Sequence, residues 1–110
     1  MIVAVQTWDL HLPGCHSLKD KRGVLKPLTS ALRRSLNVSV AETAHQDLWQ
    51  RAQLACAAVG SARPVVEEIL RSADRVIEET DGLRIVDTLT EFRGRHPPGG
   101  RSRWRKRFAR

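Results

Sequence analysis

The chain has 110 residues, 41% of them hydrophobic, which suits one domain with a single small core. No run approaches the roughly 20 consecutive apolar residues of a membrane-spanning helix, so we expect no transmembrane segment. The formal net charge of +7 comes from the C-terminal end. Residues 94–110 hold seven basic residues and no acidic ones, whereas residues 1–93 hold 12 of each, so the basic end predicts an arm for a polyanion.

Two further features of the sequence bear on the cellular compartment of the protein. The first ten residues, MIVAVQTWDL, lack the basic start of a secretory signal, so none is expected. The two cysteines, Cys15 and Cys56, are too few for a disulfide-stabilised secreted module. We therefore expect a cytoplasmic protein, in which Cys56 is a small buried apolar residue.

The first half of the chain predicts a strand, a helix and a second strand. Residues 2–12 alternate between apolar and other side chains and are rich in β-branched types, which predicts a strand that Pro13 and Gly14 end. Ser17 and Asp20 resemble a capping box, and a helix is expected on the apolar series Leu18, Leu25, Leu28, Leu32 and Leu36. Pro27 predicts a kink, or a helix that effectively begins near it. Residues 38–44 predict the second strand.

The second half predicts a strand, a helix and a final strand. Residues 50–59 alternate through Leu54, Cys56 and Ala58, which favours a strand. Pro64 suits the first turn of a helix, where Glu67 and Glu68 would favour the helix dipole. That helix has a continuous 3.6-residue apolar period up to Ile77, and residues 83–92 predict the last strand.

The order βαββαβ predicts an α+β fold of the ferredoxin-like kind, an antiparallel sheet with two helices on one face. Residues 1–93 would form this domain. Residues 94–110 open with a Pro/Gly-rich linker and lack a core period, so we expect a flexible Arg-rich tail. The other sheet face would stay open.

Four blocks of sequence carry a resemblance to a known family: HSLKDKR (16–22), VLK (24–26), NVSVAE (37–42) and QDLWQR (46–51). Together they resemble the YlxP-like family of small bacterial proteins, a domain of unknown function, over about residues 1–93. The motif residues that we single out are His16, Ser17, Leu18, Glu42, Asp47, Trp49 and Gln50.

The resemblance implies the same ferredoxin-like fold and no established enzymatic activity. Genes for such proteins often lie beside those for translation initiation and small-subunit maturation factors, so the resemblance also implies a role near ribosome assembly. The tail lies outside the shared region, and the family implies nothing about its role.

The expected functional site is a basic surface at the start of the first helix. The helix and its entry carry six basic residues against Asp20, an excess of five positive charges: Lys19, Lys21, Arg22, Lys26, Arg33 and Arg34. Such a face can meet the phosphates of folded RNA without reading sequence. We expect Lys19, Lys21, Arg22 and Lys26 to bind RNA, with Arg51 as a further contact. A solvated face that is partly paired with its acidic neighbours is the structural alternative.

The tail offers a second RNA-binding segment in which aromatic and basic residues interleave: Arg101, Arg103, Trp104, Arg105, Lys106, Arg107 and Phe108. Aromatic rings can stack on unpaired bases while the cations neutralise phosphates. A nonspecific polyanion arm and an anionic-membrane contact are alternative interpretations. The expected partner is RNA or the small ribosomal subunit, with no membrane partner and no small-molecule substrate.

The sequence also bears on metal binding, catalysis and association with other proteins. His11, Cys15 and His16 match no zinc-ligand spacing, so neither a metal nor another cofactor is expected. Glu42, His45 and Asp47 are the nearest approach to an acid/base cluster, for a small hydrolase or transferase, but a hydrogen-bonded turn is favoured and we expect no enzyme. Trp49 is expected to anchor that turn in the core or at its rim. The alternative is a homo-oligomeric or partner-binding module that uses Val3, Val5 and Thr7 on the open sheet face.

Overall fold

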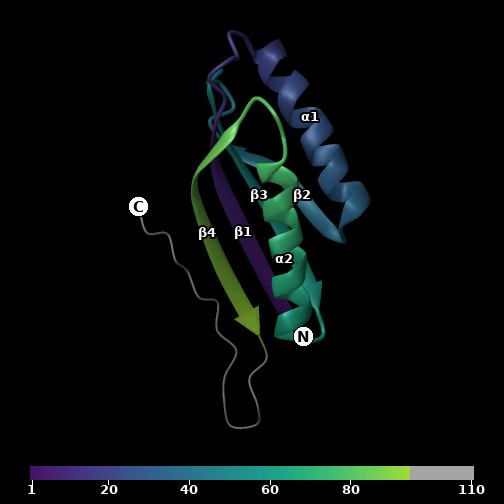
Figure 1. The fold of residues 1–110 in the computed structure, drawn as a ribbon. Helices are drawn as coiled ribbons and strands as arrows, with labels where there is room; N and C mark the ends of the chain where they lie inside the picture. Colours follow the sequence, from purple (N-terminus) through teal and green to yellow (C-terminus); the bar gives the residue numbers. More distant parts are fainter. Residues whose placement is uncertain (95–110) are drawn as a thin grey trace.

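The computed structural model describes residues 1–94 and confirms the predicted order of elements. Along the chain these are β1 (Ile2–His11), α1 (Leu18–Ser35), β2 (Val38–Ala44), β3 (Arg51–Gly60), α2 (Arg63–Glu78) and β4 (Arg84–Gly94). The strands form one sheet in the order β2-β3-β1-β4, with every neighbouring pair antiparallel (Figure 1). This is the ferredoxin-like arrangement.

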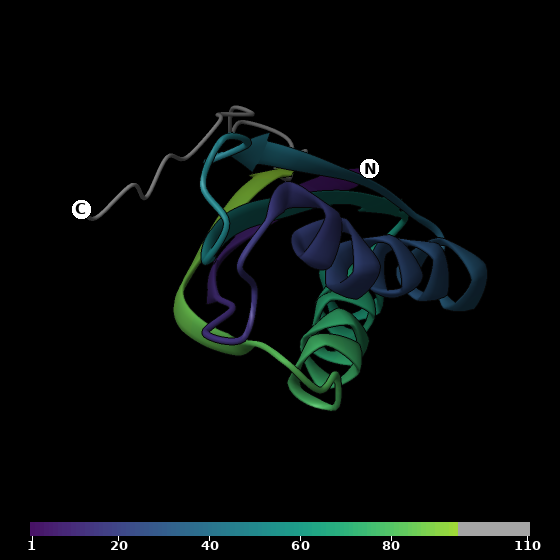
Figure 2. The same ribbon diagram turned by 90° about the horizontal axis from the view of Figure 1, so that it is seen from above.

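The two faces of the sheet differ in what covers them. Both helices pack on one face (Figure 2), against Ala4, Trp8 and Leu10 of β1, which are all fully buried. The alternate residues Val3 and Val5 point to the other face, as predicted, because successive side chains of a strand point to opposite sides. No described helix covers that second face. Whether copies of the chain associate through it stays a prediction.

Helix α1 begins at a side-chain cap, as predicted. The Ser17 hydroxyl accepts a hydrogen bond from the Asp20 backbone N–H at 3.0 Å, and the Asp20 carboxylate accepts one from the His16 N–H at 2.9 Å. These bonds satisfy backbone donors that the helix itself leaves unpaired. Leu18, the first residue of the predicted apolar series, lies at the open end of the helix and is 37% exposed.

Pro27 does not mark the start of α1. The helix runs continuously from Leu18 to Ser35 with Pro27 inside it, so the expectation that it effectively begins near Pro27 is wrong. Pro27 and Gly23, which lies four residues earlier, are both exposed. Water can therefore reach the backbone carbonyl that loses its helical partner at this point.

Helix α2 differs from its prediction in one detail. Pro64 occupies its first turn, and Val66, Leu70 and Ile77 are buried, as the apolar period predicted. The first turn holds no acidic residue, however, because the helix already begins at Arg63 and leaves Glu67 and Glu68 in the second turn. They form surface ion pairs instead, with Arg63, Arg71 and Arg75. Exposed pairs of this kind contribute little to stability.

A polar network crosses the core beneath α2. One carboxylate oxygen of Asp74 accepts hydrogen bonds from Trp8 Nε1 at 2.7 Å and from Gln6 Nε2 at 2.8 Å. The Gln6 amide oxygen in turn accepts the Thr90 hydroxyl at 2.7 Å. These bonds join α2, β1 and β4, and they satisfy donors that would otherwise be buried without partners.

The last strand extends further than the sequence predicted. It pairs with β1 up to Gly94, which lies opposite Ile2, so the folded body includes at least one residue assigned to the tail. The predicted flexibility of the Arg-rich tail falls on residues outside the described part of the chain. Among residues 1–94, no helix is long and apolar enough to cross a membrane.

Candidate nucleic-acid interface

Residues from three of the four sequence blocks that carry the resemblance meet around one buried lysine. Lys21 Nζ lies 2.7 Å from a carboxylate oxygen of Glu42, and it donates hydrogen bonds to the backbone carbonyls of His45 at 2.7 Å and Leu48 at 2.9 Å. Lys21 is only 2% exposed. The lysine therefore holds the loop between β2 and β3 against the first turn of α1.

This geometry corrects the expectation that Lys21 binds RNA. A phosphate could reach its ammonium only after the loop had moved and the pair with Glu42 had broken. Removing one partner of a buried pair is costly, because it leaves the other charge uncompensated. Lys21 is thus a structural residue, and it does not belong to the candidate interface.

A second set of bonds fixes the other end of the same loop. The Gln50 side-chain amide donates to the carbonyl oxygens of Pro13 and Cys15, at 3.3 and 3.1 Å, and the Leu12 N–H donates to the Gln50 carbonyl at 2.9 Å. The loop also turns through His45, whose φ of 65° is left-handed. The segment 45–50 is thereby tied to both β1 and α1.

The remaining predicted cations of α1 are exposed on one side of the helix. Lys19, Arg22 and Lys26 follow one another at spacings of three and four residues, which places them along a single face. Arg51, at the start of β3, is also exposed. Arg33 is partly engaged, since it donates to the Val40 carbonyl at 2.9 Å. Lys19, Arg22 and Lys26 form what we call the α1 cation face.

The loop held by Lys21 displays apolar side chains to solvent. Trp49 is 51% exposed and Leu48 is 47% exposed, so Trp49 does not lie in the core, and of its two expected places only the rim remains. The physical reason is that Lys21 and Gln50 hold the loop through its backbone and leave the indole free. A shallow cavity of about 350 Å³ lies beside it, lined by Asp47, Leu48, Trp49, Gln50 and Arg51. An accessible aromatic ring therefore lies close to a cation.

The alternative acid/base residues are not assembled into a cluster. Glu42 pairs with Lys21, His45 contributes its backbone carbonyl to the same lysine, and Asp47 is exposed. Within residues 1–94, no three His, Cys, Asp or Glu side chains are grouped so that they could hold a metal ion.

Both cysteines are buried among apolar neighbours. Burial raises the pKa of the Cys56 thiol to about 11, and burial together with the charge of Asp20 raises the pKa of Cys15. Each thiol therefore stays protonated at neutral pH, which makes it a poor nucleophile.

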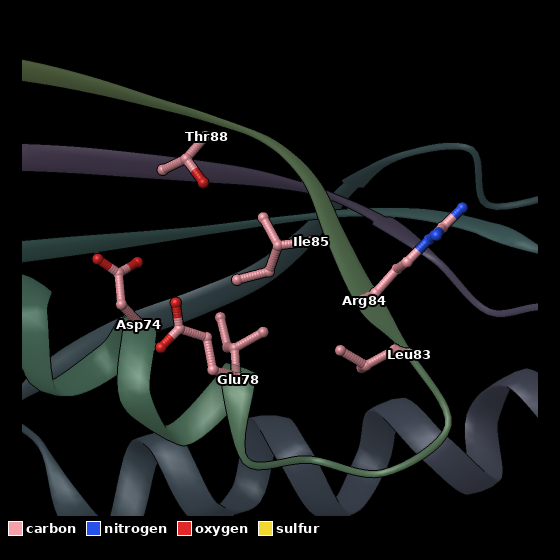
Figure 3. Close-up of a pocket in the computed structure, with 7 residues that line it drawn as sticks. Asp74, Glu78, Leu83, Arg84, Ile85 and Thr88 are labelled. Atoms are coloured by element: carbon pink, nitrogen blue, oxygen red, sulfur yellow. The ribbon is translucent and has the colours of Figure 1, made fainter.

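One cavity was not anticipated from the sequence. A cleft of about 520 Å³ lies between the C-terminal half of α2 and β4. Figure 3 shows the Asp74 and Glu78 carboxylates directed into it, facing Ile85 and Thr88, while Arg84 extends away from them. Of the residues that line this cleft, Asp74 also belongs to the core hydrogen-bond network. The only feature of the sequence that could have indicated the cleft is a carboxylate next to the buried apolar residues of α2.

The tail residues predicted to bind RNA lie outside the described part of the chain: Arg101, Arg103, Trp104, Arg105, Lys106, Arg107 and Phe108. Their role stays a prediction that rests on composition.

Comparison with known proteins agrees with the structural unit described above. Residues 3–90 match the family described as "Protein of unknown function (DUF503)". The chain is also 37% identical over 76 residues to "Uncharacterized protein YlxP" of Bacillus subtilis (strain 168), a match that covers 69% of this chain and 83% of that protein. The matched region contains the β2–β3 loop and most of the sheet, and it stops before the basic tail. The chain therefore belongs to the DUF503 family, the YlxP-like proteins whose function is not known.

Proposed function

We propose that this protein is a non-enzymatic, cytoplasmic RNA-associated protein that contacts the small ribosomal subunit and assists its assembly or translation. Two observations carry the proposal: the exposed α1 cation face, and a half-exposed Trp49 that lies next to Arg51 on a loop that Lys21 holds against α1. Cations along one helix face suit a phosphate backbone, and an accessible indole suits an unpaired base.

The hydrogen bonds that hold the β2–β3 loop favour an RNA-binding role over a surface that only contacts water. An aromatic side chain on a mobile loop would lose conformational freedom on binding, and this loss would reduce its affinity. Lys21 and Gln50 already hold the backbone on both sides of Trp49. Bases could therefore stack on the ring with little further ordering of the protein. The basic tail would raise the association rate through long-range attraction.

Neutralising the α1 cation face is expected to lower the affinity for RNA. It should also make that affinity less dependent on salt concentration. We expect Lys19→Gln/Arg22→Gln/Lys26→Gln in the full chain to bind a fluorescein-labelled RNA hairpin about tenfold or more weakly. The slope of log K against log salt should fall by about 2 to 3, since each phosphate contact contributes about 0.7–0.9. Fluorescence anisotropy between about 50 and 200 mM salt measures both quantities.

The matched control is Arg71→Gln/Arg75→Gln, which neutralises exposed arginines on α2 and leaves the α1 face intact. This control should keep nearly the full affinity and slope. Equal losses in the two variants would show that only net charge matters, and they would contradict the proposed face. Purified small ribosomal subunits, tested by co-sedimentation, extend the measurement to the proposed partner.

Trp49→Ala separates RNA binding from folding. The side chain is half exposed, so we expect the free energy of unfolding to change by less than about 1 kcal/mol. Loss of one base stack should nevertheless weaken binding of the same hairpin about tenfold. Trp49→Phe, which keeps an aromatic face, should recover most of the affinity. An Ala variant that binds RNA normally would remove Trp49 from the interface.

A further inference from the structure

The cavity beside Trp49 is lined by an acidic and a basic residue that do not pair with each other. Asp47 and Arg51 both line this cavity of about 350 Å³, and both are exposed. Within residues 1–94, neither side chain forms an ion pair or a hydrogen bond. A hydrogen-bond acceptor and a cation in one cavity are therefore both free to bind a ligand.

The carboxylate of Asp47 is unexpected on a surface that binds RNA, because phosphates repel it. Asp47 belongs to the sequence block QDLWQR, yet base stacking on Trp49 and phosphate contacts of the α1 cation face give it no role. An ionised carboxylate only accepts hydrogen bonds. The parts of RNA that donate hydrogen bonds without carrying negative charge include the edges of the bases, and contacts to base edges carry sequence information.

The bases of RNA differ in the donors that their Watson–Crick edges offer to a carboxylate. Guanine presents two adjacent donors, the N1–H and the N2 amino group, and a carboxylate can accept both at once. Adenine and cytosine each present one amino group beside an unprotonated ring nitrogen, and the N3–H of uracil lies between two carbonyl oxygens. In these three bases an acceptor would face the second carboxylate oxygen. The chemistry of Asp47 therefore favours guanine.

We propose that this cavity binds one unpaired guanine base from a loop or an end of RNA. The indole of Trp49 stacks on the base, the Asp47 carboxylate accepts hydrogen bonds from its Watson–Crick edge, and Arg51 contacts a neighbouring phosphate. The cavity volume lies at the lower end of the roughly 300–1,000 Å³ of small-molecule sites, which suits a single nucleoside. This inference rests on the proposed function and adds the identity of the base to it.

The backbone that carries Asp47 is held in place before any base binds. It lies within a turn, since the Leu48 N–H donates to the His45 carbonyl at 3.0 Å, and Lys21 donates to the carbonyls of both residues. The side-chain amide of Gln50, which also lines the cavity, already donates to two backbone carbonyls. A base therefore meets the Asp47 carboxylate on a fixed backbone, which lowers the entropy lost on binding.

Hairpins that differ at one loop position test the base preference. Three fluorescein-labelled RNAs share one stem and an otherwise all-uridine loop, with guanosine, inosine or adenosine at the loop centre. The full chain should bind the guanosine hairpin about tenfold more tightly than the adenosine hairpin, as a bidentate base contact predicts. The inosine hairpin, which lacks only the N2 amino group, should bind about threefold more weakly than the guanosine hairpin. Fluorescence anisotropy at one salt concentration measures these ratios, in which the shared phosphate contacts cancel.

Asp47→Asn separates base recognition from electrostatics. The substitution removes a negative charge, so attraction to phosphates alone predicts tighter binding of every hairpin. Base recognition predicts instead that the guanosine hairpin binds about fivefold more weakly and that the adenosine hairpin loses no affinity, so the preference falls to about twofold or less. Asp81→Asn is the matched control, because it neutralises an exposed acid outside the cavity, and it should keep the preference. The inosine comparison uses the unchanged protein and does not depend on how either variant folds.

Equal affinities for the three hairpins would overturn the guanine site and leave the proposed RNA association in place. Absence of binding to every hairpin would overturn both. A guanosine preference that persists in Asp47→Asn would contradict the role of the carboxylate.

Free guanosine monophosphate tests the other source of the same base. It should bind at least about a hundredfold more weakly than the guanosine hairpin, because it lacks the phosphates that contact the α1 cation face. Competition against the labelled hairpin measures its affinity. A mononucleotide that binds as tightly as the hairpin would make the cavity a nucleotide site and overturn its assignment to RNA.

Discussion

Replacing Lys21 with methionine is expected to lower the free energy of unfolding by about 3 kcal/mol. The substitution removes the ion pair with Glu42 and leaves the carbonyls of His45 and Leu48 without their donor. Methionine fills a similar volume, so the loss reports the charge and the hydrogen bonds more than a cavity. Urea unfolding followed by circular dichroism measures the change, and hydrogen exchange of residues 45–50 should show a less protected loop.

Lys19→Met provides the control, because Lys19 lies two residues away in the first turn of α1 and is exposed. It should change stability by less than about 0.5 kcal/mol. Glu42→Gln should cost less than Lys21→Met, since the Glu42 side chain is 30% exposed and water can replace part of its interaction. A Lys21→Met protein as stable as Lys19→Met would contradict the structural role of the buried lysine.

Asp74→Ala is expected to cost about 3 kcal/mol of stability as well. The carboxylate is the shared acceptor for Trp8 Nε1 and Gln6 Nε2, and both donors belong to residues that are almost completely buried. Hydrogen bonds to charged groups contribute about 1.5–3 kcal/mol each, and a buried donor without an acceptor carries its desolvation penalty. Water from the neighbouring α2–β4 cleft offsets part of this loss. Urea unfolding measures the change.

Asp74→Asn separates the acceptor from the charge. Its amide oxygen can still accept both hydrogen bonds, so it should recover at least about half of the stability lost in the alanine variant. Glu78→Ala, which alters the other carboxylate of the cleft, should have little effect because that residue is exposed. A large effect of Glu78→Ala, or none of Asp74→Ala, would place the stabilising role outside the core network.

The fold could be predicted from the sequence because the patterns that indicate each element are local. Apolar residues alternate along β1 and β3 and recur every 3.6 residues along α2. Each pattern arises because one face of that single element is buried. Ser17, Pro64 and Gly14 mark the ends of elements through backbone chemistry that acts within a few residues. Pro27 was the exception, since an exposed helix face tolerates a proline that a buried one would not.

The candidate site was harder to predict from the sequence than the fold, and Lys21 shows why. A lysine in a basic run predicts surface charge, and nothing within α1 distinguishes Lys21 from Lys19. The difference arises from Glu42 and the carbonyls of His45 and Leu48, more than 20 residues away along the chain. The same loop geometry leaves Trp49 exposed, although its size and apolar character favoured the core.

The sequence by itself determined the order of the six elements, the face that each presents to the core, and the concentration of excess positive charge beyond residue 93. These properties follow from side-chain period, turn residues and composition, which are fixed by neighbours in the chain. Only the tertiary structure decided which charges stay in water. It buried Lys21 and exposed Trp49, because the solvation of a side chain depends on residues that are distant in sequence and meet only after folding.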